Sequence, residues 1–173
     1  MAIEILLSVL FFLVMLFLMS LAWTGSRGAP WVPTSREAVH RMLSMAEVRP
    51  GELVYDLGCG DGRVLVAAAR LFGARAVGIE LDLSRFLFSL AVIAVLGLRR
   101  RVRVVRGDLF RQDLREADVV VSYLLQATND RLQPKLLREL RPGSRVISNT
   151  FTFSGLPLVR CDEEHRLYLY RIG

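Results

Sequence analysis

Residues 53–63, which read LVYDLGCGDGR, limit what this chain can fold into more than any other stretch. A run of strand-forming residues ends at Asp56, glycines follow at positions 58, 60 and 62, and an apolar stretch of helical composition begins after Arg63. This order is typical of a strand, a tight turn and the start of a helix. Glycines leave no Cβ atom between backbone and ligand, and the free N–H groups of a helix start attract polar ligands. The stretch predicts a turn that holds a nucleotide-like ligand; a purely structural glycine turn is the alternative.

Acidic residues recur at the ends of the next two predicted strands. Strand 76–80 ends at Glu80, 24 residues after Asp56, which is the spacing at which a carboxylate reaches ribose hydroxyls in nucleotide-binding folds. Strand 102–105 leads into Asp108 and Leu109. Each acid alone is explained as well by a helix cap. Together, three acids at successive strand ends predict one cofactor site.

Strands and helices alternate through the rest of the chain. A helix with Thr34 and Glu37 in capping-box spacing opens the folded part, and its apolar stripe is Val39, Met42, Leu43 and Ala46. Later elements are expected as strands at 118–124 and 144–148, a helix from about residue 130 with leucines 132, 136, 137 and 140 on one face, and a closing hairpin of 158–160 with 167–171. The pattern predicts an α/β fold, a doubly wound and mostly parallel sheet with a terminal antiparallel hairpin.

An uncharged run of 19 residues extends from Ile5 to Trp23, which is long enough to cross a bilayer as a helix. A cleaved signal peptide is the alternative, but Glu4 rather than Lys or Arg precedes the run, and the run exceeds a usual signal core. Arginines follow it at 27, 36 and 41, so the positive-inside rule puts the later part in the cytoplasm. We therefore expect a single-pass anchor at 1–23, a linker at 24–33 and a cytoplasmic domain at 34–173.

Composition argues against several other classes of site. The chain has only two histidines, His40 and His165, so no metal cluster is expected. Its two cysteines, Cys59 and Cys161, lack C-x-x-C spacing and are expected to be free thiols. The net charge of +6 comes mainly from arginines that are scattered except at 99–103, so no nucleic-acid partner is expected.

The motif D-x-G-x-G-x-G from Asp56 to Gly62 resembles the first motif of class I, seven-β-strand methyltransferases that use S-adenosylmethionine. It does not match the NAD-binding fingerprint, because Arg63 stands where the third glycine belongs. Further segments resemble the protein-lysine methyltransferases that include archaeal soluble enzymes and mitochondrial membrane-anchored ones. These segments are WVPT at 31–34, YLL at 123–125, LLRELRPGSRV at 136–146 and LYLY at 167–170.

This resemblance implies S-adenosylmethionine as methyl donor and a protein lysine as acceptor, with membrane proteins as substrates of the anchored relatives. The residues expected to hold the cofactor lie in the glycine turn and at the next two strand ends: Asp56, Gly58, Cys59, Gly60, Gly62, Glu80, Asp108 and Leu109. The resemblance also implies that Pro33 and Thr34 border the substrate channel.

Tyr123, at the end of the fourth predicted strand, is the candidate catalytic residue, as a wall of an aromatic channel that desolvates the acceptor amine. Trp31 and Asn149 are further candidates for this wall. Where the relatives carry Ser-His-Asp-Phe after the fifth strand, this chain has SNTF at 148–151, without the acid. Two alternatives therefore stay open: a lipid or quinone methyltransferase, and a membrane module that binds the cofactor without turnover.

Residues 86–98 form a predicted helix without any charged residue, followed at once by arginines at 99, 100, 101 and 103. A surface helix of this fold class usually shows one polar face to water. The stretch is too short to span a bilayer. We expect it to lie either against anionic lipid headgroups or against protein, the linker or a second copy of the chain.

Overall fold

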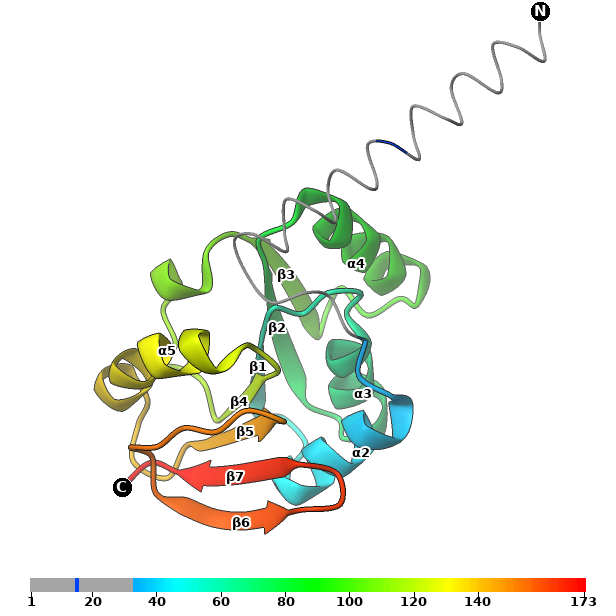
Figure 1. Ribbon diagram of the computed structural model, residues 1–173. Coiled ribbons are helices and arrows are strands. Elements are labelled where there is room, and N and C mark those ends of the chain that lie inside the picture. The colour runs from blue at the N-terminus through cyan, green and yellow to red at the C-terminus, as the bar shows by residue number, and fades with distance from the viewer. Residues whose placement is uncertain (1–14, 16–32) are drawn as a thin grey trace, which may run out of the picture. The chain divides into compact units, whose positions relative to one another are not determined.

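The computed structural model describes Met15 and residues 33–173, and the chain divides into two compact units, 1–32 and 33–173. The second unit is an α/β domain around one seven-stranded sheet of order β3-β2-β1-β4-β5-β7-β6 (Figure 1). The first five strands in the sequence run parallel, and β7 lies antiparallel between β5 and β6. The predicted fold is thereby confirmed, including the terminal antiparallel hairpin.

The elements follow one another in strict alternation until the final hairpin. Their bounds are β1 Leu53–Leu57, β2 Arg75–Glu80, β3 Val102–Arg106, β4 Val119–Ser122, β5 Arg145–Asn149, β6 Leu158–Asp162 and β7 Leu167–Arg171 for the strands, and α2 Arg36–Met45, α3 Arg63–Leu71, α4 Leu83–Val95, the 3-10 turn η1 Leu109–Arg111 and α5 Gln126–Glu139 for the helical segments. The strand order reverses between β1 and β4, and in open parallel sheets ligands bind at the carboxyl ends of the strands beside such a point.

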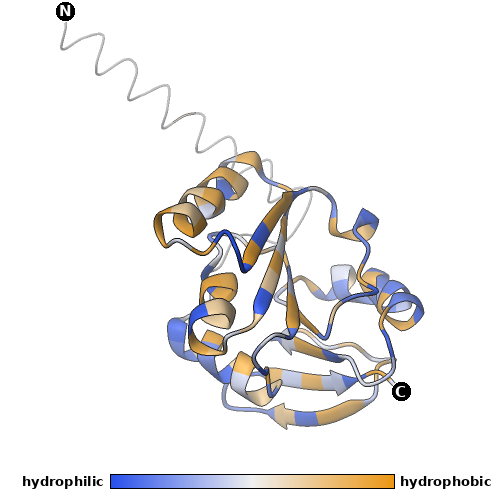
Figure 2. Cartoon of the chain, turned by 180° about the vertical axis from the view of Figure 1, so that it is seen from behind, coloured by the Kyte–Doolittle hydropathy of each residue, from blue (hydrophilic) through white to orange (hydrophobic). Residues whose placement is uncertain are grey.

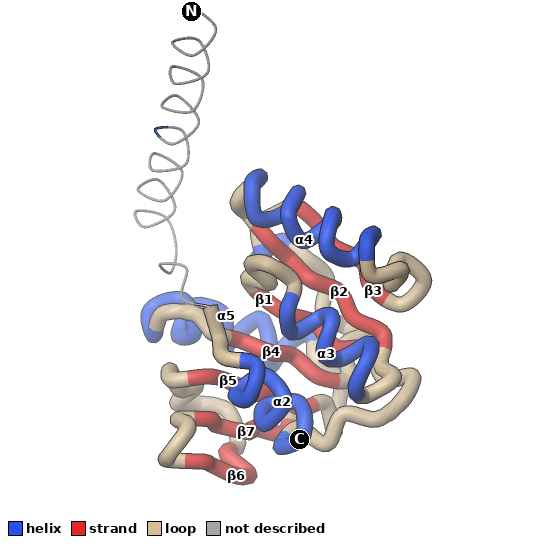
Figure 3. The backbone as a smooth tube through the Cα atoms, turned by 90° about the vertical axis from the view of Figure 1, so that its right-hand side faces the viewer, coloured by secondary structure: helices blue, strands red, loops and turns tan. Residues whose placement is uncertain are grey.

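Two apolar cores lie on opposite faces of the sheet. Helices α2, α3 and α4 cover one face, and α5 covers the other (Figure 3). The first core contains the buried stripe of α2 together with side chains of α3 and of the sheet. The second contains Leu132 and Leu136 of α5 packed on Leu57 and Val120 of the sheet. Central parallel strands buried on both faces need continuous apolar sequence, and β4 reads VVVS accordingly.

Three sequence-based expectations were wrong in detail. The N-cap of α2 is Ser35, whose side chain accepts a hydrogen bond from Ala38 N, and not Thr34. Helix α5 begins at Gln126, four residues before the expected start, because polar residues of its first turn bond to the loop after β5. Leu137 is 49% exposed rather than buried, because only Leu132, Leu136 and Leu140 of α5 face the sheet.

No helix within the described part of the chain is long and apolar enough to cross a membrane. The predicted anchor and linker, residues 1–33, fall outside the described residues except for Met15 and Pro33.

Candidate cofactor and acceptor site

The glycine turn lies between β1 and α3, at the carboxyl edge of the sheet. Gly58, Gly60 and Gly62 all have positive φ, at 90°, 55° and 80°. A Cβ atom on Gly62 would lie 2.7 Å from the Ser89 hydroxyl of α4, so no side chain fits there. The turn therefore keeps its backbone close to α4 and presents the start of α3 without side chains in front of it.

Glu80 holds this turn in place from the end of β2. The side chain is 5% exposed, and its two oxygens accept hydrogen bonds of 2.9 Å from Gly60 N and from Asp82 N. One carboxylate thus joins the glycine turn to the first residues before α4. Glu80, the residue predicted to bind the ribose, therefore also stabilises the glycine turn. Its carboxylate oxygens can still accept a hydrogen bond from a ligand hydroxyl.

Asp56 lies at the end of β1, 5% exposed and close to two other carboxylates. Burial, followed by repulsion from Glu80 and Asp61, raises the pKa of Asp56 to about 7. A ligand that brings positive charge and hydroxyl donors relieves this repulsion. S-adenosylmethionine carries a sulfonium, an ammonium and ribose hydroxyls, so the buried carboxylates and the bare glycine turn fit this group.

Arg63 connects the glycine turn to the segment before α2. Its guanidinium donates to both Asp61 oxygens, at 2.9 and 3.0 Å, and to the carbonyl oxygen of Thr34. Partial burial raises the pKa of Asp61, but the hydrogen bonds from Arg63 outweigh this effect, and the pKa stays below its ordinary value. Thr34, predicted to border the substrate channel, thus lies beside the cofactor turn; Pro33 is exposed and Trp31 falls outside the described residues.

Asp108 and Leu109 follow β3 and open the 3-10 turn η1. The Asp108 carboxylate accepts a hydrogen bond of 2.9 Å from Phe110 N, which is the capping role considered from the sequence. Both residues are half-buried, and Gly107 N donates to the Glu80 carbonyl at 2.9 Å. The β3 turn is therefore tied to the same strand end that carries Glu80.

Cys59 is the one predicted cofactor residue whose side chain turns into the core. It is 4% exposed, its thiol lies 4.0 Å from the Ser89 hydroxyl, and a Cβ atom on Gly78 would come within 2.6 Å of the sulfur. Burial, together with the nearby acids, raises the pKa of this thiol. Its backbone N–H donates to the Ile79 carbonyl at 3.0 Å. Cys161 is exposed, and both cysteines are free, as expected.

A neutral hydrogen-bond network joins the ends of β4 and β5. The Ser122 hydroxyl donates to Asn129 Oδ1 at 3.0 Å, and Asn129 Nδ2 donates to Ser148 Oγ and to the Phe151 carbonyl, both at 3.3 Å. Ser122, Asn129 and Ser148 are all fully buried. Gln126 adds a reciprocal pair with the backbone of Thr152, at 2.9 and 3.1 Å. The sequence prediction missed this network because it began the helix after Asn129, and no local pattern pairs Asn129 with Ser148 or Phe151.

The two acceptor-side candidates directly follow Ser122 and Ser148 of this network in the sequence. Tyr123 follows directly after β4 and is half-buried, while Asn149 ends β5 and is 8% exposed. Asn149 Oδ1 accepts a hydrogen bond of 3.0 Å from Thr150, whose φ of 68° is left-handed. Such a strained non-glycine residue recurs at functional sites because surrounding contacts must hold it. Here the Thr150 amide donates to the Arg166 carbonyl at 2.7 Å.

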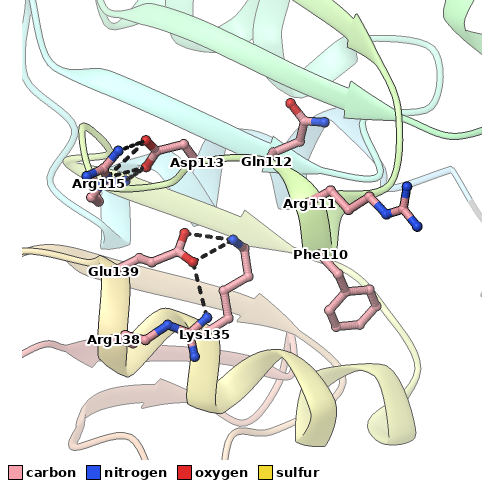
Figure 4. A pocket seen from close by; sticks show the side chains of 8 residues that line it. All are labelled: Phe110, Arg111, Gln112, Asp113, Arg115, Lys135, Arg138 and Glu139. Atoms are coloured by element: carbon pink, nitrogen blue, oxygen red, sulfur yellow. Dashed lines mark hydrogen bonds and ion pairs between the residues drawn. The ribbon is translucent and has the colours of Figure 1, made fainter.

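Two further clusters lie away from these residues. An open hollow of about 470 Å³ between η1 and α5 is lined by Phe110, Arg111, Gln112, Asp113, Arg115, Lys135, Arg138 and Glu139, with Lys135 paired to Glu139 at 2.7 Å (Figure 4). None of these residues is among the predicted site residues. Asp162, Glu164 and His165 bring ligand atoms within 4.8 Å of one another, but Asp162 is already paired with Arg41 at 3.1 Å and with His165 at 3.2 Å.

Comparison with known proteins agrees with this arrangement. The family model described as the ANTKMT methyltransferase domain matches residues 56–160. A protein-lysine N-methyltransferase of Saccharolobus islandicus is 42% identical over 151 residues, covering 83% of this chain and 94% of that protein. The adenine nucleotide translocase lysine N-methyltransferase of Mus musculus is 36% identical over 124 residues, covering 70% of this chain and 53% of that protein.

Among solved structures, an RNA methyltransferase of Salinibacter ruber in complex with S-adenosyl-L-homocysteine is similar with a TM-score of 0.77 and 39% identity. The match covers 82% of this chain and 92% of that one. The bound demethylated cofactor of that structure agrees with the donor expected from the glycine turn and the buried carboxylates. The family match spans more than half of this chain, from Asp56 to Arg160 within β6, and the chain belongs to the ANTKMT methyltransferase family of class I S-adenosylmethionine-dependent methyltransferases.

Proposed function

We propose that this enzyme methylates lysine side chains of membrane or membrane-proximal proteins, and that residues 5–23 anchor it in the bilayer with the domain on the cytoplasmic side. The observation that carries the lysine acceptor is the 42% identity to a protein-lysine N-methyltransferase across 94% of that protein's length. The uncharged run from Ile5 to Trp23, with arginines only on its C-terminal side, supports the anchor and its orientation.

The geometry suits methyl transfer to a neutral amine. When bound, S-adenosylmethionine supplies a methyl group already activated by the sulfonium. Glu80 and Asp56 hold the cofactor by charge and hydrogen bonds. The glycines of the turn have no Cβ atoms, so the cofactor can approach the backbone closely. We place the acceptor channel at Tyr123 and Asn149, which directly follow Ser122 and Ser148 of the neutral network and would exclude water from the acceptor. The acceptor loses its proton before the transfer, because only the unprotonated amine has a lone pair, and desolvation favours that form.

A second acceptor class has an observation of its own. The similar Salinibacter ruber protein, 39% identical, is described as an RNA methyltransferase. An RNA acceptor is therefore the competing outcome for the same site. A lipid or quinone acceptor, considered from the sequence, is the third outcome.

The decisive experiment incubates purified full-length protein and methyl-labelled S-adenosylmethionine with membranes, cytosol and total RNA of its source. Protein, RNA and lipid extract are then separated and counted. A Lys135→Arg variant is used throughout, because Lys135 is the only lysine of the chain and its replacement removes lysine self-labelling as a background. This change keeps a positive partner for Glu139.

We expect label in discrete membrane protein bands, in methylated lysine after hydrolysis, and its loss in a Glu80→Ala variant. Label confined to RNA or to the organic extract would overturn the lysine proposal. The anchor is tested by cell fractionation of the full chain beside a chain that starts at residue 24. A full chain that stays in the cytosolic fraction would refute the anchor and leave the lysine proposal standing.

A further inference from the structure

Helix α4 exposes an apolar face that no described element covers. Leu87, Phe88 and Val95 are 53%, 58% and 86% exposed, and Leu83 and Leu90 are 47% and 37% exposed. These side chains share the outer side of the helix, whereas Ser89 and Ile93 are buried on the other. In Figure 2 the helix is coloured as hydrophobic along most of its length. A contiguous exposed patch of large apolar side chains marks an interaction surface rather than ordinary surface variation.

The opposite helix provides the contrast. On α5 the outward residues include Asp130, Arg131 and Arg138, and Leu137 is its single large exposed apolar side chain. Both helices cover the same sheet, but only α5 exposes to solvent the polar face that is typical of a surface helix. The apolar surface of α4 is therefore specific to that helix and does not follow from the fold.

Positive charge borders the apolar face at one end. Arg99 and Arg100, in the turn after α4, are exposed. Arg101 follows them, with Nη1 reaching the Ala69 carbonyl at 3.5 Å. From residue 81 to 106 the chain has six arginines and one acid, Asp82. Arg103 does not belong to this rim, because Val102 and Val104 of β3 face the α4 side and the alternation of a strand turns Arg103 to the other face.

We infer that α4 lies on the surface of an anionic phospholipid bilayer, with its apolar side chains among the acyl chains and Arg99 and Arg100 at the headgroups. Charge complementarity favours lipid phosphate as the partner. An apolar strip with arginines at one end matches the boundary between the acyl chains and the anionic headgroups of a membrane. An RNA surface would instead need polar or stacking groups where Leu83, Leu87 and Val95 stand. This inference deepens the proposed membrane location but does not need residues 5–23 to span.

The same helix touches the cofactor turn from its buried side. Ser89 of α4 lies against Cys59 and Gly62, and Asp82, the N-cap of α4, donates its amide to Glu80. A bilayer that held α4 would therefore hold the element that backs the cofactor site and would bring the site's edge toward membrane-embedded acceptors.

The test places a nitroxide spin label on full-length protein in phosphatidylcholine vesicles with and without phosphatidylglycerol. Cys161→Ser removes the exposed thiol, and Cys59 stays unlabelled because it is buried. Labels are introduced by Leu87→Cys on α4 and by Leu137→Cys on α5, an apolar position of similar exposure. Collision with oxygen, which concentrates in lipid, is compared with collision with a water-soluble nickel chelate. Ser8→Cys reports separately on the proposed anchor.

We expect position 87 to favour oxygen over nickel in anionic vesicles and position 137 to favour nickel. Replacing Arg99 and Arg100 by Gln should weaken the burial of position 87, by about fivefold in partitioning per arginine. The matched pair Arg111→Gln and Arg138→Gln, on the other face, should leave it unchanged. Equal nickel access at 87 and 137 overturns the inference. Shielding of position 87 from both oxygen and nickel would also overturn it, because this result would mean that protein covers the helix. Protection of position 87 by added RNA would overturn it as well.

If the label at position 8 lies in lipid and the label at position 87 lies in water, the proposed anchor is supported and the proposed membrane contact of α4 is refuted. The reverse result would retain the surface and refute the anchor.

Discussion

The strands of the two halves of the sheet end in side chains of different chemistry. On the cofactor side, β1 and β2 end in the buried carboxylates of Asp56 and Glu80, and the second is fastened by backbone amides. On the acceptor side, β4 and β5 end in hydroxyl and amide groups, the network of Ser122, Asn129 and Ser148. Charge therefore gathers at the strand ends where we place the cationic cofactor, and it is absent from the network beside the proposed acceptor channel, where an amine must be uncharged to react.

This difference teaches where substitutions should act. Changes on the cofactor side should weaken binding of S-adenosylmethionine, since the contacts that we propose for these carboxylates depend on charge. Changes on the acceptor side should lower turnover with little effect on cofactor affinity, because a neutral network contributes position rather than binding energy.

The largest effect is expected for Gly58→Arg. Gly58 has a φ of 90°, and even a Cβ atom there would lie 3.3 Å from Leu124. We expect loss of cofactor binding by more than about 100-fold, measured by calorimetry. The control is Gly51→Arg, which has nearly the same backbone conformation, with a φ of 84°, but open space around it. Equal loss in both variants would mean that strain, and not the ligand site, is responsible.

Glu80→Gln should weaken cofactor binding by about 10- to 100-fold, because hydrogen bonds to a charged group are worth ~1.5–3 kcal/mol each. The matched control is Glu139→Gln, another partly buried carboxylate that accepts a backbone hydrogen bond, here from Leu114 N at 3.2 Å. That variant should bind the cofactor normally. Unchanged cofactor affinity in the Glu80→Gln variant would mean that Glu80 only stabilises the glycine turn and does not bind the cofactor.

Cofactor affinity should depend on pH through Asp56. Because the pKa of Asp56 is raised to about 7, the ligand-free protein holds a proton there below that pH, and the cation must displace it. Affinity should therefore fall by about tenfold per pH unit below 7 and level off above it. In the ligand-free protein the free energy of unfolding should fall as pH rises toward 7. An Asp56→Asn variant with the same pH profile would assign the effect to another group.

Asn129→Ala should separate turnover from binding. Loss of the side chain removes the hydrogen bonds that join the ends of β4 and β5. We therefore expect kcat to fall by about tenfold while cofactor affinity stays unchanged. The free energy of unfolding should fall by ~1–3 kcal/mol. Gln133→Ala is the control, since Gln133 also holds a loop amide, that of Gly155 at 2.7 Å, farther along α5. Parallel loss of cofactor affinity would show that the two halves are not independent.

The smallest change is expected for Tyr123→Phe, a reduction of kcat by about threefold, because it removes only a hydroxyl group from the proposed channel wall. Tyr123→Ala should be more severe because it removes the wall itself. Tyr168→Phe on β7 serves as the control for loss of a half-buried hydroxyl. Unchanged turnover in both Tyr123 variants would remove this residue from the site.

The strand ends and the glycine turn of the proposed cofactor half were predictable because their signals are local. Asp56 and the glycines lie in one turn, Glu80 follows by one strand-turn-helix unit, and the strand that carries each acid is short and apolar. The acceptor half was only partly predictable. Tyr123 could be placed from the end of its strand, but Asn129 in α5 meets Ser148 and Phe151 across 19 and 22 residues, and a polar residue at a helix start gives no sign of such partners.

The sequence by itself determined the order of strands and helices, the glycine turn after β1 and the uncharged character of residues 86–98, because periodicity, glycine spacing and charge are properties of neighbouring residues. Only the tertiary structure decided which leucines of α5 are buried, that the Cys59 side chain points into the core, that Arg103 leaves the arginine rim, and that α4 turns its apolar side outward. These outcomes depend on which face an element presents to the sheet, and packing between distant segments sets that face.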